Sequence, residues 1–150
     1  MTRARATVPT GFSVLPIGGG FIVDNGPLYV RQDGDVVRLG FRVEARHCNL
    51  LGILHGGMMA TFCDMLLPVA AHRGSAALGQ RFLPTVSLQV DYLSPVPQGA
   101  WVEGTAQVLR TTRSLVFVQG LVDADGEPAA RASGILKIGG PFTPPLPEVG

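Results

Sequence analysis

Short apolar segments separated by polar turn signals dominate the early part of the chain. Residues 21–44 alternate between such segments and the dipeptides Asn25-Gly26 and Asp33-Gly34, which are typical of two-residue hairpin turns. Successive residues of a strand point to opposite faces, so an alternation of apolar and polar residues indicates a half-buried strand. We therefore expect about two or three antiparallel strands in this region.

The same alternation predicts further strands in the second half of the chain. In the stretch TVSLQVDYLSP, which begins at Thr85, apolar residues occupy one face and polar residues the other. More strands are expected at 101–109, 115–123 and 129–138, separated by the polar segments RTTRS and DADGEP. The final segment, GGPFTPPLPEVG, is too rich in proline and glycine for regular structure and is expected to form a tail.

One segment lacks this alternation and predicts a helix. From 56 to 71, mainly alanine, methionine, leucine and threonine run for about four helical turns. Larger apolar side chains cover much of the helical wheel, and a stripe of mostly small residues fills one side: Gly57, Ala60, Thr61, Asp64, Pro68 and Ala71. A helix that is apolar on nearly every side is expected to be buried. Pro68 lacks an amide hydrogen and is expected to kink the last turn.

These elements favour an α+β fold, in which one long central helix is wrapped by a curved antiparallel sheet of about five or six strands. No repeat and no internal linker interrupts the chain. We expect an N-terminal extension at 1–19, one folded domain at 20–139 and a tail at 140–150. A chain of 150 residues, 46% of them hydrophobic, is long enough to bury a core as one such domain.

The low charge of the chain narrows the classes of partner. Only 15% of the residues are charged and the mean hydropathy is +0.30, which leaves little polar surface for a monomer and indicates a subunit interface. A formal net charge of +1 gives no electrostatic reason to expect a nucleic-acid partner. Asp64 and Pro68 interrupt the most apolar run before it is long enough to cross a bilayer, so no membrane partner is expected.

The cysteines and histidines show no spacing typical of a metal site or a disulfide framework. Cys48 and Cys63 are 15 positions apart and form no CxxC motif, and His47 and His72 have no metal-like partners in the sequence. We therefore expect no metal and no cofactor. The same cysteine usage favours a reducing compartment, and we expect a soluble, cytoplasmic protein.

Asp64 is the residue of the apolar run that most needs an explanation. A buried carboxylate without a partner is expensive, so a function or a hydrogen bond must compensate for it. Held among apolar side chains, Asp64 would be a stronger base than a solvated carboxylate, which favours a catalytic role. The alternative is a structural carboxylate bonded to Thr61 or to the backbone.

Gly56 and Gly57 open the predicted helix. The first amides of a helix have no partner within it and lie at the positive end of the helix dipole, and a glycine has no Cβ to block a ligand. This is an oxyanion site in outline. The alternative is that the glycines only permit tight packing. His55, which precedes them, is expected to be a turn or capping residue rather than a catalyst.

Several motifs together resemble a known family. Asn49, the HGG triplet at 55–57, Asp64, a strand ending in DYLSP and a later DADG hairpin resemble the hotdog-fold acyl-CoA thioesterases. The likeness is closest to the group that contains the phenylacetate-pathway and 4-hydroxybenzoyl-CoA thioesterases. It covers roughly residues 20–138.

The resemblance implies a hotdog fold and the hydrolysis of an acyl-CoA thioester to a free acid and coenzyme A. It implies that Asn49 and the Gly56 amide bind the thioester carbonyl. Asp64 would act as general base or nucleophile, and Thr85, at a place often held by Ser or Thr, would help to orient the water. His55 would support the loop and Asn49 rather than act as the base.

Three further residues are candidates for substrate binding. Gly57 lies beside Gly56 at the start of the helix. Arg110 and Arg113 bracket a predicted hairpin, and their guanidinium groups are suited to the phosphates of coenzyme A. The alternative is that both arginines belong to an ordinary solvated hairpin.

The spacing of the candidate groups predicts the oligomeric state. Asp64 follows Gly56 by eight positions, which is about 12 Å along a helix, whereas a carbonyl and its attacking water must approach within about 3.5 Å. We therefore expect a homodimer with shared sites, in which antiparallel helices meet across a twofold axis. One chain would supply Asn49 and Gly56, and the other Asp64 and Thr85. A dimer of such dimers, a homotetramer, is also compatible with this geometry.

Two other functions fit parts of the pattern. A non-catalytic acyl-CoA-binding hotdog module would keep the glycines and the pocket without needing Asp64. A hotdog hydratase or dehydratase would pair an Asp with a His as acid and base. The nearest histidine, His55, lies nine positions before Asp64, on the far side of the predicted helix. Thioester hydrolysis is therefore the preferred interpretation.

Overall fold

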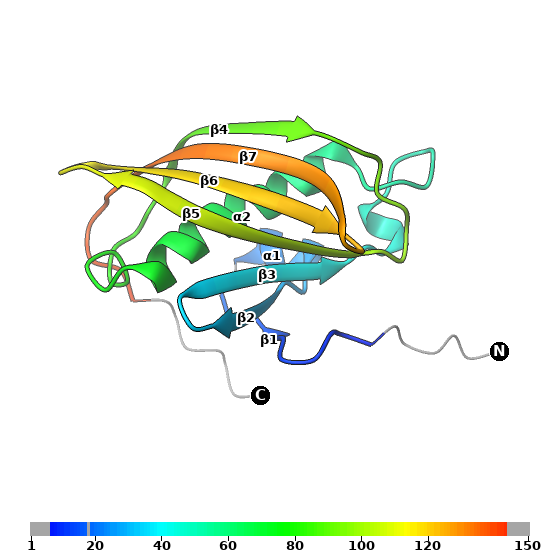
Figure 1. Ribbon diagram of the computed structural model, residues 1–150, viewed down its shortest axis with the longest axis horizontal. Helices are drawn as coiled ribbons and strands as arrows, with labels where there is room; N and C mark the ends of the chain where they lie inside the picture. The colour runs from blue at the N-terminus through cyan, green and yellow to red at the C-terminus, as the bar shows by residue number, and fades with distance from the viewer. Residues whose placement is uncertain (1–6, 18, 144–150) are drawn as a thin grey trace.

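A long helix lies against one curved antiparallel sheet (Figure 1). The computed structural model describes residues 7–17 and 19–143. The sheet has seven strands in the order β1-β2-β3-β5-β6-β7-β4. The elements are β1 (Ser13–Val14), α1 (Gly20–Asn25), β2 (Tyr29–Asp33), β3 (Val36–Arg42), the 3-10 helix η1 (Ala45–His47), α2 (Gly56–Gly74), β4 (Thr85–Tyr92), β5 (Trp101–Thr111), β6 (Leu115–Ala124) and β7 (Glu127–Lys137).

This is the predicted hotdog architecture, with a slightly higher strand count because a two-residue β1 joins the sheet. α2 begins at Gly56, as expected, and ends three positions after the predicted Ala71. Pro68 lies inside the helix, which continues beyond it to Gly74. The domain boundaries at 19 and 139 remain predictions, and the predicted tail lies outside the described residues from 144 onward.

One early element was predicted wrongly. Residues 20–25 form α1 rather than a strand, and Asn25-Gly26 ends this helix instead of making a hairpin turn. Pro27 gives the physical reason, because a hairpin turn centred on Asn25-Gly26 would need an amide hydrogen at the next position. A hairpin does form at Asp33-Gly34, between β2 and β3, but its two turn residues are Gly34 and Asp35, because Asp33 still pairs with Val36. Gly34 has a φ of +60°.

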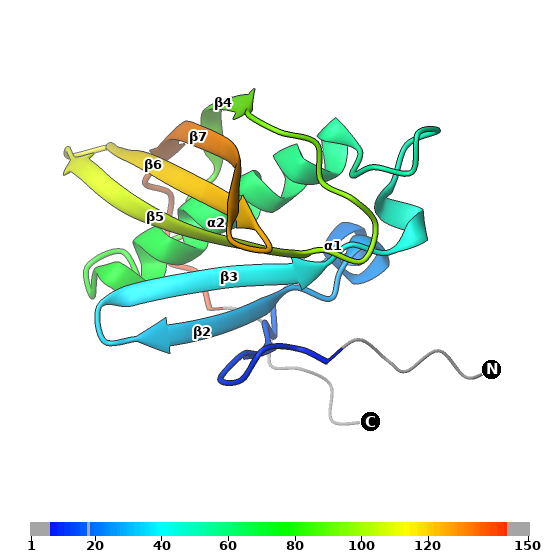
Figure 2. The same ribbon diagram turned by 45° about the vertical axis from the view of Figure 1, so that its right-hand side comes forward.

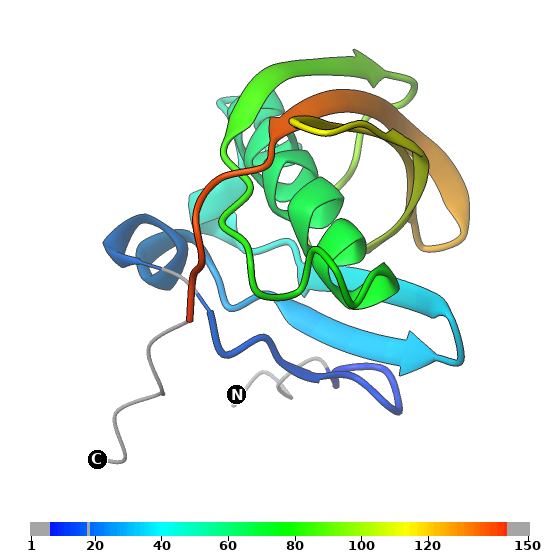
Figure 3. The ribbon, with the colours of Figure 1, turned by 90° about the vertical axis from the view of Figure 1, so that its left-hand side faces the viewer.

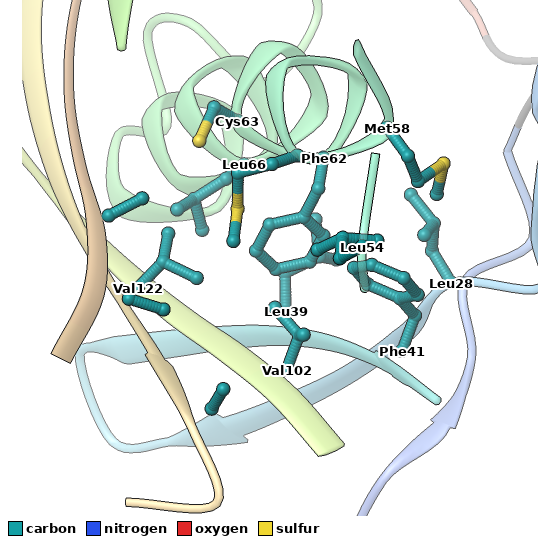
Figure 4. Close-up of a cluster of buried hydrophobic side chains, with 14 of the residues drawn as sticks. Leu28, Leu39, Phe41, Leu54, Met58, Phe62, Cys63, Leu66, Val102 and Val122 are labelled. Carbon is teal, nitrogen blue, oxygen red and sulfur yellow. The ribbon is translucent and has the colours of Figure 1, made fainter. Parts of the chain in front are cut away.

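The core lies between α2 and the concave face of the sheet. Phe62 of α2 packs against Phe41 of β3, with ring centroids 5.2 Å apart (Figure 4). Sheet glycines allow the helix to approach closely, because a Cβ at Gly134 would lie 2.5 Å from the Leu67 side chain. Burying a side chain of this kind contributes about 1.5–3 kcal/mol. This packing fixes α2 in its position over the sheet.

The sheet covers only one side of α2, as the view along the helix in Figure 3 shows. The predicted stripe of small residues is the less buried side, although Ala71 within it is fully buried. The expectation that the helix is buried all round, with Asp64 inside, is therefore wrong for the single chain, where Asp64 is exposed. The helical wheel led to this wrong expectation because many residues of the stripe are small or apolar but do not face the sheet.

β4 forms one edge of the sheet, and β7 is its only neighbour among the described strands. All of its residues are exposed or half-buried. Within residues 7–17 and 19–143, no helix combines the length and hydropathy needed to span a membrane.

Candidate active site

The structure brings Asp64 and Thr85 together. The Thr85 hydroxyl donates a hydrogen bond to the Asp64 carboxylate at 2.7 Å. Thr85 lies opposite Leu136 of β7, whose side chain is fully buried, so Thr85 points to the helix side of the sheet. A β-bulge between Thr85 and Ser87 then shifts the register of the strand. The first residue of β4 therefore holds one carboxylate oxygen of Asp64 in a fixed direction.

The structural alternative for Asp64 expected a hydrogen bond to Thr61 or to the backbone. Among the described residues, the Asp64 carboxylate accepts from Thr85 and from neither of these.

 Instead, the Thr61 hydroxyl donates to the carbonyl oxygen of Gly57 at 2.9 Å, one helical turn earlier. Cys63, the neighbour of Asp64, is buried, and burial together with the charge of Asp64 raises the pKa of its thiol to about 12. Cys63 therefore stays protonated near neutral pH and is not a candidate nucleophile.

The start of α2 leaves one amide open. His55 is the N-cap, and its Nδ1 accepts a hydrogen bond from the amide of Gly57 at 2.8 Å. Within the described part of the chain, the amide of Gly56 donates no hydrogen bond. The positive end of the helix dipole lies at this same point. Gly56 can therefore offer an amide to a ligand, whereas the Gly57 amide is already occupied.

Asn49 lies in a tight turn just before the helix. Its Oδ1 accepts from the amide of Leu51 at 2.9 Å, and its backbone amide donates to Ile53 at 2.8 Å. With Oδ1 engaged in this way, the Nδ2 group remains as a donor. The expected support of Asn49 by His55 is not a direct one, because no hydrogen bond joins the two residues among those described.

Tyr92 contacts the start of α2 and was not predicted as a site residue. Its hydroxyl donates to the carbonyl oxygen of Gly56 at 2.6 Å. Burial is the main cause that raises the pKa of Tyr92, so the hydroxyl remains a donor at neutral pH. The alternation in TVSLQVDYLSP places Tyr92 on the apolar face of its strand. A tyrosine there brings a hydroxyl that needs a partner, and this was the available signal.

The two ends of β4 therefore contact two points of α2. Thr85 at the start of the strand meets Asp64, and Tyr92 at its end meets Gly56. Gly56 and Asp64 lie in one continuous helix, so the spacing of about 12 Å between them is retained within the chain. A pocket of about 370 Å³ opens beside Gly56 and Tyr92.

Arg110 and Arg113 are not brought to the helix start. Both are exposed, and they lie at the hairpin between β5 and β6. In Figures 1 and 2 this hairpin and the start of α2 are at opposite ends of the molecule. Within one chain, the two arginines therefore lie away from the Gly56 amide.

The described residues contain no cluster of three or more histidine, cysteine, aspartate or glutamate side chains suited to a metal ion. His47 is buried and bonds through Nε2 to the carbonyl oxygen of Asn25 at 2.7 Å. His72 makes the same kind of contact with Arg81 at 2.6 Å. Both rings therefore have structural partners.

Comparisons with known proteins point to one family. The profile of the Thioesterase superfamily matches residues 51–129. A suspected esterase of Pseudomonas aeruginosa is 28% identical over 136 residues, which is 87% of this chain and 97% of that protein. Mouse acyl-coenzyme A thioesterase 13 is 33% identical over 79 residues, so the match spans 51% of this chain and about half, 52%, of that protein.

A solved structure shows the same fold at low identity. A protein of Streptococcus pneumoniae, described as a hypothetical thioesterase and crystallised with coenzyme A, superposes with a TM-score of 0.68 at 15% identity. The superposition covers 77% of this chain and 88% of the other.

Proposed function

The chain belongs to the thioesterase superfamily, a family of thioester hydrolases, and on this basis we propose that it hydrolyses acyl-coenzyme A thioesters to a free acid and coenzyme A. Two of the similar proteins support this substrate class. One is named as an acyl-coenzyme A thioesterase, and the other was crystallised with coenzyme A. The observation that carries the proposal is the hydrogen bond between Thr85 and Asp64 beside the exposed face of α2.

Asp64 supplies the reactive carboxylate. Thr85 holds Oδ1, which leaves Oδ2 for a water molecule or a carbonyl carbon. As a general base, Asp64 takes a proton from water while the water oxygen bonds to the thioester carbon. The tetrahedral intermediate then expels the coenzyme A thiolate, which receives a proton, and the acid is released.

The same position also suits a nucleophile. In that case Asp64 bonds to the thioester carbon, the coenzyme A thiolate leaves, and water hydrolyses the resulting anhydride. Both routes use the same residue and give the same products. They differ in the anhydride, which only the nucleophilic route forms. When water attacks the aspartyl carbonyl of the anhydride, single-turnover hydrolysis in ¹⁸O-labelled water places ¹⁸O in the carboxylate of Asp64, which mass spectrometry detects.

The start of α2 stabilises the developing negative charge. The open amide of Gly56 and the Nδ2 group of Asn49 can each donate a hydrogen bond to the thioester oxygen. Gly57 contributes by its lack of a side chain, because a Cβ there would lie 3.0 Å from the His55 ring. His55 shapes the loop through its bond to the Gly57 amide.

A second copy of the chain completes the site. Gly56 and Asp64 are too far apart along α2 to act on one carbonyl, which requires contacts of about 3.5 Å. In an antiparallel dimer, Asn49 and Gly56 of one chain face Asp64 and Thr85 of its partner. The exposed edge strand β4 suits such pairing, because its outward amides and carbonyls have no neighbour among the described strands. A dimer of dimers would preserve these sites.

A panel of acyl-CoA substrates tests the proposal. Release of free thiol, followed with a thiol reagent, is expected for the wild-type protein and is expected to be lost in Asp64→Asn. A non-catalytic module would bind the same substrates and release no thiol. A hydratase would change the absorbance of an enoyl-CoA substrate without releasing thiol. Either of these results would contradict the assignment.

A further inference from the structure

A second cavity lies along the open side of α2, beyond Asp64. It measures about 460 Å³ and is bordered mainly by apolar side chains, among them Leu15, Ile17, Met65, Val69, Phe82 and Phe142. His72 and Arg73 also border it. Its volume is within the usual range for small-molecule sites. The reaction proposed above assigns no role to this cavity.

The helix places this cavity beside the reactive carboxylate. Met65 follows Asp64 directly, and Pro68 lies four positions after it; both line the cavity. Helix residues four apart have Cβ atoms within about 6 Å of each other. The inner end of the cavity is therefore about one helical turn from Asp64, on the same open side of α2.

The segment after β7 builds one wall. The amide of Phe82 donates to Gly140 at 3.0 Å, the amide of Gly139 donates to Phe82 at 2.8 Å, and the amide of Phe142 donates to Gln80 at 2.8 Å. The rings of Phe82 and Phe142 pack with centroids 5.4 Å apart. Figure 3 shows this segment, in red, running past the end of α2. The wall is therefore held by regular backbone pairing.

The segment before α1 builds the opposite wall. The amide of Leu15 donates to the carbonyl oxygen of Leu28 at 2.8 Å, and its side chain is 6% exposed. Ile17 packs against the core from the same segment. The terminal segments of the two walls, 15–17 and 139–142, thus lie outside the residues matched by the family profile.

We propose that this cavity receives the acyl group of the thioester and that its two terminal walls limit the length of that group. The inference rests on the proposed function. A thioester has a polar coenzyme A arm on one side of its carbonyl and the acyl group on the other. A mostly apolar cavity one turn from Asp64 favours an apolar acyl group with several carbons over an acetyl group.

Non-hydrolysable thioether analogues of acyl-CoA test this directly, because they measure binding without turnover. With alkyl groups from ethyl to dodecyl, the dissociation constant measured by calorimetry should fall about fourfold per added methylene and then level off when the cavity is full. Ile17→Trp should move this plateau to shorter chains. Phe142→Ala should move it to longer ones.

Leu121→Trp is the matched control. Leu121 is exposed on β6, facing away from α2, so the chain-length profile should be unchanged. Should Ile17→Trp fail to fold by circular dichroism, Phe142→Ala still decides, because Phe142 is 38% exposed near the chain end.

Three results would overturn the inference. A plateau that neither variant moves would place the acyl group elsewhere and leave the proposed function intact. A plateau moved by Leu93→Trp instead would assign the acyl group to the pocket beside Gly56, which Leu93 lines. A change in oligomeric state in the wall variants, without a change in the chain-length profile, would show that a second copy covers the cavity. No binding of any thioether would instead contradict the proposed function itself.

Discussion

α2 meets the edge strand β4 through two side-chain hydrogen bonds that differ in kind. At one, the Thr85 hydroxyl donates to the carboxylate of Asp64 at 2.7 Å; at the other, the Tyr92 hydroxyl donates to the backbone oxygen of Gly56 at 2.6 Å. The first orients a side chain that a substitution can remove. The second orients backbone, whose amide no substitution of Gly56 removes except proline. The Gly56 end must therefore be tested through Tyr92.

The charge of the acceptor also separates the two contacts. A hydrogen bond to a charged group contributes about 1.5–3 kcal/mol, and one between neutral groups about 0.5–1.5 kcal/mol. Both pairs are exposed in the single chain, which favours the lower part of each range. Variants at the Asp64 end should therefore have larger effects than variants at the Gly56 end.

Removing the carboxylate should have the largest effect. Asp64→Asn is expected to fold normally, to bind acyl-CoA and to lose at least about a hundredfold in kcat, because a general base or nucleophile commonly contributes that much. Thiol release measures the rate, and calorimetry with a thioether analogue measures binding. Hydrolysis near the wild-type rate would exclude Asp64 from the chemistry.

Mixing two inactive variants tests whether the two ends meet across chains. Asn49→Ala and Asp64→Ala subunits are unfolded and refolded together. Random pairing makes about half of the dimers mixed, and each mixed dimer has one intact site, so about a quarter of the wild-type activity should return. An inactive mixture, with mixed dimers confirmed by native mass spectrometry, would contradict the shared site.

Thr85→Val removes the hydroxyl at the Asp64 end while keeping the shape of the side chain. We expect kcat to fall about tenfold, because the carboxylate loses a charge-assisted hydrogen bond. Thr85→Ser is the matched control and should retain most of the activity. Equal activity in the valine and serine variants would show that the hydroxyl does not orient Asp64.

Tyr92→Phe removes the hydroxyl at the Gly56 end. We expect kcat to fall about threefold with little change in KM, because a neutral hydrogen bond that positions the oxyanion amide is lost. Tyr29→Phe is the matched control, since Tyr29 packs on Trp101 in another part of the fold. A larger loss in Tyr92→Phe than in Thr85→Val would reverse the ranking of the two ends.

Local sequence signals predicted much of the fold and part of the site. The helix start at Gly56 followed from the glycine pair and from the end of strand alternation. The strands from β4 to β7 followed from their period of two. The proximity of Thr85 to Asp64 was implied only by the family resemblance, and the structure shows the contact.

The failures came from information that local patterns do not carry. The exposure of Asp64 depends on how far the sheet wraps around α2, which a helical wheel cannot show. The contact between Tyr92 and Gly56 joins residues 36 positions apart. α1 has six residues, too few for a clear helical period. The dipeptide Asn25-Gly26 therefore led to the prediction of a hairpin turn instead.

His47 ties the Gly56 end to the rest of the fold. Its Nδ1 accepts from the amide of Glu44 at 3.0 Å, its Nε2 contacts Asn25, and its carbonyl accepts from the amide of His55 at 2.8 Å. Burial is the main cause that lowers the pKa of His47 below the usual 6.5, against the opposing effect of the bond to Asn25. The folded state therefore favours the neutral ring.

The smallest expected effect is a pH-dependent loosening of the Gly56 end alone. Above pH 6.5, the usual pKa, His47 is neutral in both states and its contribution to stability is complete. As the pH falls below that value, the unfolded chain binds a proton that the folded chain does not, so the free energy of unfolding decreases until the lower folded pKa is reached. Hydrogen exchange, corrected for its intrinsic pH dependence, should show falling protection at 47–55 and steady protection at the start of β4. His47→Gln should abolish the difference, and an equal loss of protection at both ends would show that His47 does not act locally.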